Sequence, residues 1–288
     1  VTPQTPASND SGVPKDSTDA FPDKVYVVAT GNEGYAINSS LSLYDVNAST
    51  VTDDLFSSAS GRSLGMTAND MVTDGTEGYI AVTSSNTSEI VSLPTGKSIK
   101  QISLAGKEYS GPRRMTKVSS YIYVTMKSGH LVRIDTKTKE IDKVVAFTPL
   151  EGSTMGTYPE GLDITNRNVY VALSGQGDQI ENRVAVVDAL SMEFKQYITV
   201  ATNLTDILVA DNRLFALSSG WYDANNGWVQ KDAGLYEFDD NGSKGLKCAA
   251  TMATTNGGRN IYYINAPYGA STTSLGVYYV RNANSRTL

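Results

Sequence analysis

An all-β fold of repeated four-stranded antiparallel blades, a β-propeller, is predicted by three features of this sequence. A short run of β-branched and aromatic residues recurs six times, at intervals of 43 to 54 residues. A second run, apolar or alternating, follows each of them after a loop. The 288 residues include 17 tyrosines and many Val, Ile, Thr and Ser residues, which favour strands joined by turns. A period in the forties with several short strands per unit is typical of propeller blades.

The strands of each predicted blade are named A to D, from the centre of the ring outward. Strand B is expected at 25–28, 79–82, 122–124, 169–171, 214–216 and 261–263, and strand C at 41–44, 90–93, 131–134, 184–187, 235–238 and 277–280. Strand D is expected at 99–104, 141–147 and 194–200, and strand A at 70–73, 114–117, 161–164 and 205–209. The first unit has no clear A strand and the sixth ends after C, which predicts a six-bladed ring with an irregular closing blade or part of a seven-bladed ring.

Four of the six C runs are followed at once by an aspartate, namely Asp45, Asp135, Asp188 and Asp239. Recurrent carboxylates invite a catalytic interpretation. Aspartate at the start of a turn also accepts hydrogen bonds from the backbone amides of that turn. We favour this structural role for all four.

The links between strands differ in length. The A–B and C–D links are short and alike, whereas the B–C and D–A links vary widely, up to the run 218–233. In a propeller the B–C and D–A links share one face. Length variation is therefore expected on a single face, which is where repeat proteins carry binding.

Residues 1–23 have a different composition from the rest of the chain. They hold four of the nine prolines, and Phe21 is their only aromatic residue. Such a segment cannot bury enough apolar surface to offset its ordering entropy. We therefore expect a disordered polar tether or chain end over 1–23 and one propeller domain over 24–288.

Composition excludes several classes of function. A net charge of −6 and a pI near 4.9 argue against nucleic-acid binding and against a polybasic membrane surface. No apolar run approaches the length of a membrane-spanning helix. One cysteine and one histidine allow neither an internal disulfide nor a Cys/His zinc site, and no cofactor is expected. Cys248 is expected to be a buried thiol in a strand and His130 a surface turn residue.

Several segments resemble a known family. The run from His130 to Val145 (HLVRIDTKTKEIDKVV) resembles the repeat of the YVTN/YncE-like β-propellers, as do YPEGLDI at 158–164 and NRVAVVD at 182–188. YVTM at 123–126 differs by one residue from the eponymous tetrapeptide. The resemblance covers residues 24–288.

With its polar N-terminal segment, the chain also looks like the surface lipoprotein propellers of Bacteroidota. Among these, the BtuG group captures cobalamin and hands it to an outer-membrane transporter. The resemblance implies an extracytoplasmic, cell-surface protein whose lipid anchor lies upstream of Val1. It implies a small-molecule or glycan ligand, with cobalamin as one example, and an outer-membrane transporter as a partner.

The D–A links are expected to place polar side chains at the mouth of the central channel. The positions concerned are Asn69, Asp70, Arg113, Arg114, Tyr158, Glu160, Asn203, Asp206, Arg259 and Asn260. A few convergent polar groups in a concave site are typical of small-ligand binding. We predict a ligand-binding floor made of Arg113, Tyr158, Glu160, Asn203 and Arg259, and we count Asp206 among the ligand-binding residues. The alternative is that these groups pair only with one another and with water.

The loop 220–228 holds both tryptophans of the chain. Trp221, Tyr222 and Trp228 could stack on a sugar ring or a planar ligand as an aromatic wall, with Tyr35 and Tyr268 as outer candidates. The alternative is a loop pinned to its own blade by these side chains. Asp223, Asn225 and Gly227 faintly resemble a calcium loop, but the later bidentate acid of an EF-hand is missing.

No catalytic residue is predicted. The single histidine follows a turn, and no Gly-x-Ser-x-Gly elbow is present. Binding without turnover is therefore expected. Two alternatives stay open: a calcium-dependent propeller lactonase that would hold its ion with Glu160, Asn203 and Asp206, and a scaffold for protein contacts.

Overall fold

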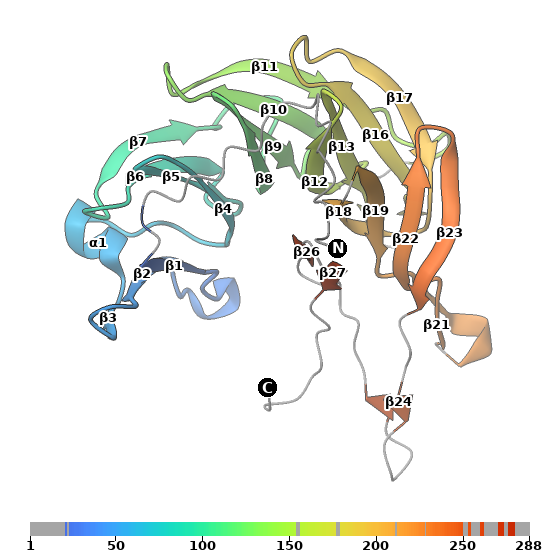
Figure 1. Cartoon of the computed structure of the whole chain (residues 1–288), viewed down its shortest axis with the longest axis horizontal. Coiled ribbons are helices and arrows are strands. Elements are labelled where there is room, and N and C mark those ends of the chain that lie inside the picture. Colours follow the sequence, from blue (N-terminus) through green and yellow to red (C-terminus); the bar gives the residue numbers. More distant parts are fainter. Residues whose placement is uncertain are drawn as a thin grey trace, which may run out of the picture.

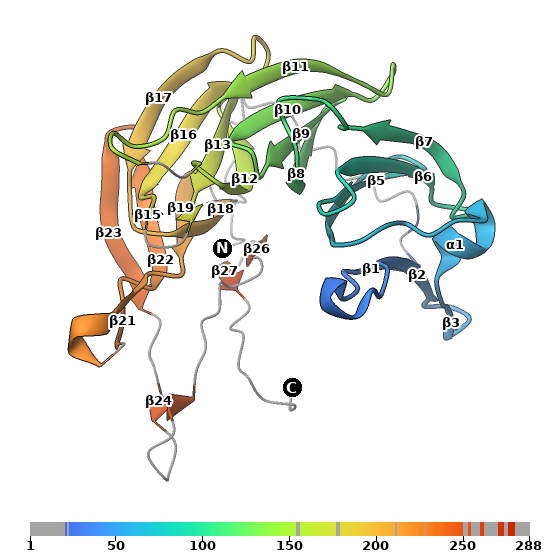
Figure 2. The ribbon, with the colours of Figure 1, turned by 180° about the vertical axis from the view of Figure 1, so that it is seen from behind.

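The computed structural model describes residues 21, 23–153, 156–176, 179–210, 212–227, 229–249, 253–254, 260–261, 270–273 and 276–279. This part of the chain is all-β apart from one short α-helix, α1 (Leu55–Ser60), and two single turns of 3-10 helix, η1 (Glu33–Tyr35) and η2 (Ala224–Asn226). Its sheets follow one another in chain order around a common centre (Figure 1). The same arc is seen from behind in Figure 2. The fold is propeller-like, as the sequence predicts.

Five sheets form the blades, four with four strands and one with three. Blade 1 holds β1 (Lys24–Ala29), β2 (Ser40–Asp45) and β3 (Thr50–Thr52); blade 2 holds β4 (Ala68–Asp74), β5 (Glu77–Val82), β6 (Thr87–Ser92) and β7 (Ser98–Ser103); blade 3 holds β8 (Pro112–Val118), β9 (Tyr121–Met126), β10 (His130–Asp135) and β11 (Glu140–Ala146). Blade 4 holds β12 (Pro159–Thr165), β13 (Asn168–Leu173), β16 (Arg183–Asp188) and β17 (Phe194–Thr199); blade 5 holds β18 (Leu204–Ala210), β19 (Arg213–Ser218), β22 (Gly234–Asp239) and β23 (Gly242–Ala249). The predicted order A to D is confirmed in blades 2 to 5, and blade 1 lacks an A strand among the described residues.

The hydrophobic cores lie between blades. Each of four clusters draws its buried side chains from two successive blades, so the B and C strands of blades 2 to 5 are largely buried on both faces, whereas β1 of blade 1 has one exposed face. In blades 1 and 3 the third residue of strand B is a tyrosine that forms a hydrogen bond with the next blade. The hydroxyl of Tyr26 donates to the Leu93 carbonyl at 2.9 Å, and that of Tyr123 donates to the Ala189 carbonyl at 2.7 Å. Burial raises the pKa of Tyr123 to about 12, so this donor keeps its proton.

The recurrent aspartates cap turns, which confirms their predicted structural role. Oδ1 of Asp188 accepts hydrogen bonds from the amides of Leu190 and Ser191 at 2.9 and 3.0 Å. Asp45, Asp135 and Asp239 accept from amides of their own turns in the same way. The bond from Ser191 is the main reason that the pKa of Asp188 falls to about 2.

The predicted blade count is wrong for the described part of the chain, which holds five blades and does not close into a ring (Figure 1). The sixth B and C runs were expected to pair with each other. Instead, β25 (Asn260–Ile261) pairs with β24 (Ala253–Thr254), and β27 (Gly276–Tyr279) pairs with β26 (Ala270–Thr273). Short hairpins close smaller loops than the expected pairing and lose less chain entropy. The rest of this repeat lies outside the described residues.

Helix α1 and the N-terminal segment lie outside the strands of the blades. Helix α1 was not predicted; Asp54 caps its first turn, and the Phe56 ring is fully buried between blades 1 and 2. Residues 1–20 and 22 of the predicted tether lie outside the described part, while the Phe21 ring packs edge-on against Tyr26. Among the described residues, no helix has the length and apolar character needed to span a membrane.

Candidate ligand site at the channel mouth

The B–C and D–A links lie side by side on one face, as predicted. The first residue after strand B donates its amide proton to the residue just before strand A, for example from Lys127 to Gly111 at 2.7 Å and from Ser174 to Tyr158 at 3.1 Å. The same bond recurs from Thr83 to Thr67 and from Ser219 to Asn203. This face is called the loop face below. The recurring hydrogen bond gives it a regular backbone frame, made of the residues that donate and accept this bond, beneath its variable loops.

Two predicted site residues, Tyr158 and Asn203, are part of that frame. Thr67, Gly111, Tyr158 and Asn203 occupy the same position in four blades, and all have a left-handed backbone, with φ of 63, 69, 48 and 54°. This region is costly for a bulky side chain. Both the amide and the hydroxyl of Ser174 donate to the Tyr158 carbonyl and hold it there. The Asn203 side chain is fixed too, because its Nδ2 donates to the Gly220 carbonyl at 3.0 Å.

Two other carboxylates of the inner strands, Asp70 and Asp163, called the channel carboxylates below, join neighbouring blades. Asp70 accepts from its own neighbour Met71 and from the amide of Met115 in the next blade, both at 2.9 Å. Asp163 does the same with Ile164 and with Val209 of blade 5, again at 2.9 Å. Burial raises the pKa of Asp70 despite these bonds and the nearby Arg114.

Asp206, another predicted site residue, fills the space that Gly161 leaves. Its Oδ1 accepts from the Ile207 amide at 3.0 Å. A Cβ on Gly161 would lie 2.0 Å from this oxygen and 2.5 Å from the Asp206 Cα. Asp206 is thus a packing contact between blades 4 and 5.

Arg113 and Glu160 come together as predicted, from the mouth ends of β8 and β12. Arg113 Nε lies 3.0 Å from Glu160 Oε2, and its Nη2 lies 2.6 Å from both carboxylate oxygens. The two side chains are 28% and 13% exposed. Burial raises the pKa of the Glu160 carboxyl, while Arg113, Arg114 and Lys127 act in the opposite direction.

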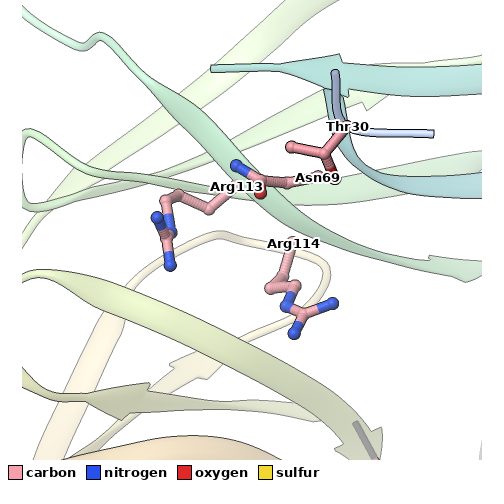
Figure 3. Close-up of a pocket in the computed structure, with 4 residues that line it drawn as sticks. All are labelled: Thr30, Asn69, Arg113 and Arg114. Carbon is pink, nitrogen blue, oxygen red and sulfur yellow. The ribbon is translucent and has the colours of Figure 1, made fainter. Parts of the chain in front are cut away.

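A cavity of about 610 Å³ opens beside this pair, lined by Thr30, Asn69, Arg113 and Arg114 (Figure 3). Asn69 Nδ2 donates to the Thr83 hydroxyl, which in turn donates to the Pro112 carbonyl at 2.5 Å. Thr30 follows β1, so blades 1, 2 and 3 all contribute to the wall. The sequence did not single out Thr30, because it lies just after a B strand rather than in a D–A link.

The tryptophan loop forms its own hairpin, β20 (Trp221–Asp223) with β21 (Val229–Lys231). Trp221 Nε1 donates to Asp232 Oδ2 at 2.8 Å, and the Lys231 ammonium lies 5.2 Å from the centre of the Trp221 ring. The structure therefore supports the alternative interpretation for Trp221, a side chain that pins its own loop. The calcium-loop resemblance is not supported, because both Asp223 oxygens are taken, by Lys231 and by the Asn225 amide.

Of the other predicted residues, some can be located in the structure and others lie outside its described part. Tyr35 is 80% exposed on η1, whose Glu33 accepts a hydrogen bond from Ser84 at the loop face. Tyr222 lies in β20, but its side chain is outside the described part, as are Trp228, Arg259 and Tyr268. His130 opens β10 and is half-buried beside Ser128. Cys248 lies in strand β23 as expected, and its burial stays a prediction.

Each of the three proposed calcium ligands has a protein partner in this structure. Glu160 pairs with Arg113, Asp206 with the Ile207 amide, and Asn203 with Gly220. Within the described ranges, no group of three or more His, Cys, Asp and Glu side chains is placed to hold a metal ion.

Comparison with known proteins supports the fold and no more. No protein-family profile and no curated protein matches the sequence. Similar solved structures include Saccharomyces cerevisiae Sqt1 (TM-score 0.57, 12% identity, 79% of this chain and 58% of that one) and the computationally designed Ika8 protein (0.53, 11%, 81% and 63%). Hydrazine synthase of Kuenenia stuttgartiensis is also similar (0.53, 16%, 83% and 67%). Sqt1 and Ika8 are propellers, and this chain spans about three fifths of their length.

Proposed function

We propose that this chain is a non-enzymatic ligand-binding propeller that captures a small molecule or glycan on its loop face, at the mouth of the channel. The observation that carries this proposal is the cavity of about 610 Å³ beside the Arg113–Glu160 pair. Its size falls within the range of ordinary ligand pockets, about 300–1,000 Å³. Its lining residues are polar and come from three blades, which suits a ligand held by hydrogen bonds.

The choice of face rests on the same geometry. The opposite face is built of uniform turns closed by aspartates. The loop face carries the two inserted hairpins, β14–β15 (Gly175–Gln176, Gln179–Ile180) and β20–β21. Variation in loops on a rigid frame is how repeat folds diversify binding.

Binding without turnover is preferred to catalysis. A calcium-dependent lactonase would require Glu160, Asn203 and Asp206 to give up the protein partners described above. A protein-interaction scaffold, the third interpretation, would not need a cavity. Neither alternative uses the Arg113–Glu160 pair.

The proposed setting is the outside of the cell, with a lipid anchor upstream of Val1 and an outer-membrane transporter as partner. Its support is the polar composition of residues 1–23 and the resemblance to surface lipoprotein propellers. Cobalamin is therefore one of the ligands to test.

A thermal-shift screen tests the function directly. The purified chain would be melted with cobalamins, neutral glycans, organic acids and calcium. A ligand that binds the native state raises Tm by mass action, and we expect at least one organic compound to do so. Calcium-dependent hydrolysis of a lactone panel, abolished in Glu160→Gln, would establish the enzyme alternative instead.

A further inference from the structure

The inner strands share an irregularity at the channel mouth. Strand register shifts between Ala68 and Asp70, Pro112 and Met115, Pro159 and Leu162, and Leu204 and Asp206. Such bulges redirect side chains and break the alternation of a strand. As a result, two consecutive residues, Arg113 and Arg114, both line the cavity.

Blade 3 is the only one of these four with two cations at the bulge. The equivalent residues are Asn69 and Asp70 in blade 2, Glu160 and Gly161 in blade 4, and Thr205 and Asp206 in blade 5. The whole chain carries a net charge of −6. The two consecutive arginines that line this cavity are therefore cations in a chain whose net charge is negative.

The ion pair leaves part of Arg113 available. Glu160 accepts from Nε and Nη2, and among the described residues no hydrogen bond from Nη1 is formed. A guanidinium has five N–H donors in a fixed plane, which suit carboxylate and phosphate oxygens. Glu160 holds that plane in place at the edge of the cavity.

Another carboxylate, that of Asp70, interacts with Arg114 and is held by the backbone. Both of its oxygens accept backbone amide protons, from Met71 and Met115. Lys127 adds a third cation beside the mouth, with its ammonium 5.5 Å from the centre of the Tyr158 ring.

We infer that this cavity is an anion site, in which Arg113 and Arg114 together bind the carboxylate or phosphoryl group of a small ligand, with Asn69 and Thr30 as additional polar contacts. The inference rests on the proposed function and names the ligand class for the same site. Glu160 acts as a positioning residue that orients Arg113.

Calorimetry at constant ionic strength tests the inference with three probes: inorganic sulfate, gluconate and glucose 6-phosphate. Glucose is the neutral control. We expect at least one anion to bind and glucose to bind much more weakly. Gluconate against glucose 6-phosphate decides between a carboxylate and a phosphoryl group.

Two variants remove the cations. The double variant avoids leaving Glu160 without its arginine, and in Arg114→Gln the Asp70 carboxylate keeps its two backbone amide partners. Arg114→Gln, and the double variant Arg113→Gln with Glu160→Gln, should each weaken the bound anion about tenfold or more, because a hydrogen bond to a charged group is lost. Arg167→Gln removes the same charge from the exposed A–B turn of blade 4 on the opposite face and should leave affinity within twofold.

These experiments distinguish a failure of the anion site from a failure of the proposed function. Anion binding that survives both variants, or no binding of any of the three anions, overturns the anion site. If a neutral compound from the thermal screen binds all variants equally, the proposed function stands while the anion site falls. If no compound of any charge binds, both fall.

Discussion

Two groups of carboxylates along the inner strands do different work. In the channel, Asp70 and Asp163 each accept backbone amides from two successive blades. At the mouth, the partner of the Glu160 carboxylate among the described residues is a side chain, Arg113. A backbone amide cannot move without moving its strand, whereas an arginine can exchange one oxygen partner for another. The channel carboxylates therefore hold successive blades together, whereas the mouth carboxylate is held by a side chain that could change partners.

Among the variants proposed here, a substitution of Gly161 should lower the free energy of unfolding the most. In Gly161→Val the new Cβ would lie 2.5 Å from the Asp206 Cα, so one strand would have to shift. We expect a loss of about 3 kcal/mol in the free energy of unfolding, measured by urea denaturation. Gly34→Ala is the control, since its Cβ would meet nothing closer than Asn32 Oδ1 at 3.5 Å. A small loss in Gly161→Val would show that the blades are not tightly packed there.

Asp163→Ala tests whether channel carboxylates bind blades together. The change removes the acceptor of two backbone amides, that of the buried Ile164 and that of the half-buried Val209. We expect a loss of about 1–3 kcal/mol, the cost of unpaired buried donors. Asp135→Ala, at a solvent-exposed turn, should cost less. Equal losses for the two variants would remove the distinction between channel and turn aspartates.

Replacing the Arg113–Glu160 pair should affect ligand binding more than stability, the opposite of the result expected for the channel carboxylates. Replacing Arg113 and Glu160 together by Gln removes both charges at once, and paired replacement of an ion pair is often close to neutral. We expect unfolding to change by less than about 1 kcal/mol, while anion binding is lost. A large destabilisation would place this pair with the structural carboxylates.

Acid unfolding sharpens the comparison through the turn aspartates. The pKa of Asp188 is about 2 in the folded chain, below its ordinary 3.8, so its contribution to stability is present above pH 3.8 and is lost as the pH falls through about 2. Asp188→Ala should therefore lower stability by about 0.5 kcal/mol at neutral pH, because the hydrogen bonds face solvent. The difference from the original chain should disappear near pH 2. A difference that persists there would point to packing.

The blades could be predicted from the sequence because their signals are local. The extended conformation of runs such as 122–124 and the cap at Asp188 depend on neighbours within one hairpin or turn. The sixth repeat shows the limit of that reasoning, since Ile261 and Tyr278 pair with partners that the repeat does not indicate. Helix α1 was missed because its six residues are fixed by Asp54 and by burial of Phe56 rather than by a periodic pattern.

The candidate site was predicted in outline only. The sequence indicated that polar residues of the D–A links approach the channel, and Arg113 does meet Glu160. It could not show that Tyr158 and Asn203 would be held in a left-handed frame or that Trp221 would bond its own loop. Each of these outcomes depends on which donor lies next to which acceptor once the links are folded.

The sequence alone determined the repeated blades, the capped turns and the face that varies, since strand alternation and turn chemistry act over a few residues. The tertiary structure decided which charges meet. Arg113 and Glu160 are 47 residues apart, and they come together only because successive inner strands lie side by side around the centre. The bulge that places Arg114 in the same cavity is likewise set by pairing between β8 and β9. Burial, hydrogen bonding and charge pairing at that mouth follow from the arrangement of successive blades and not from any local run of residues.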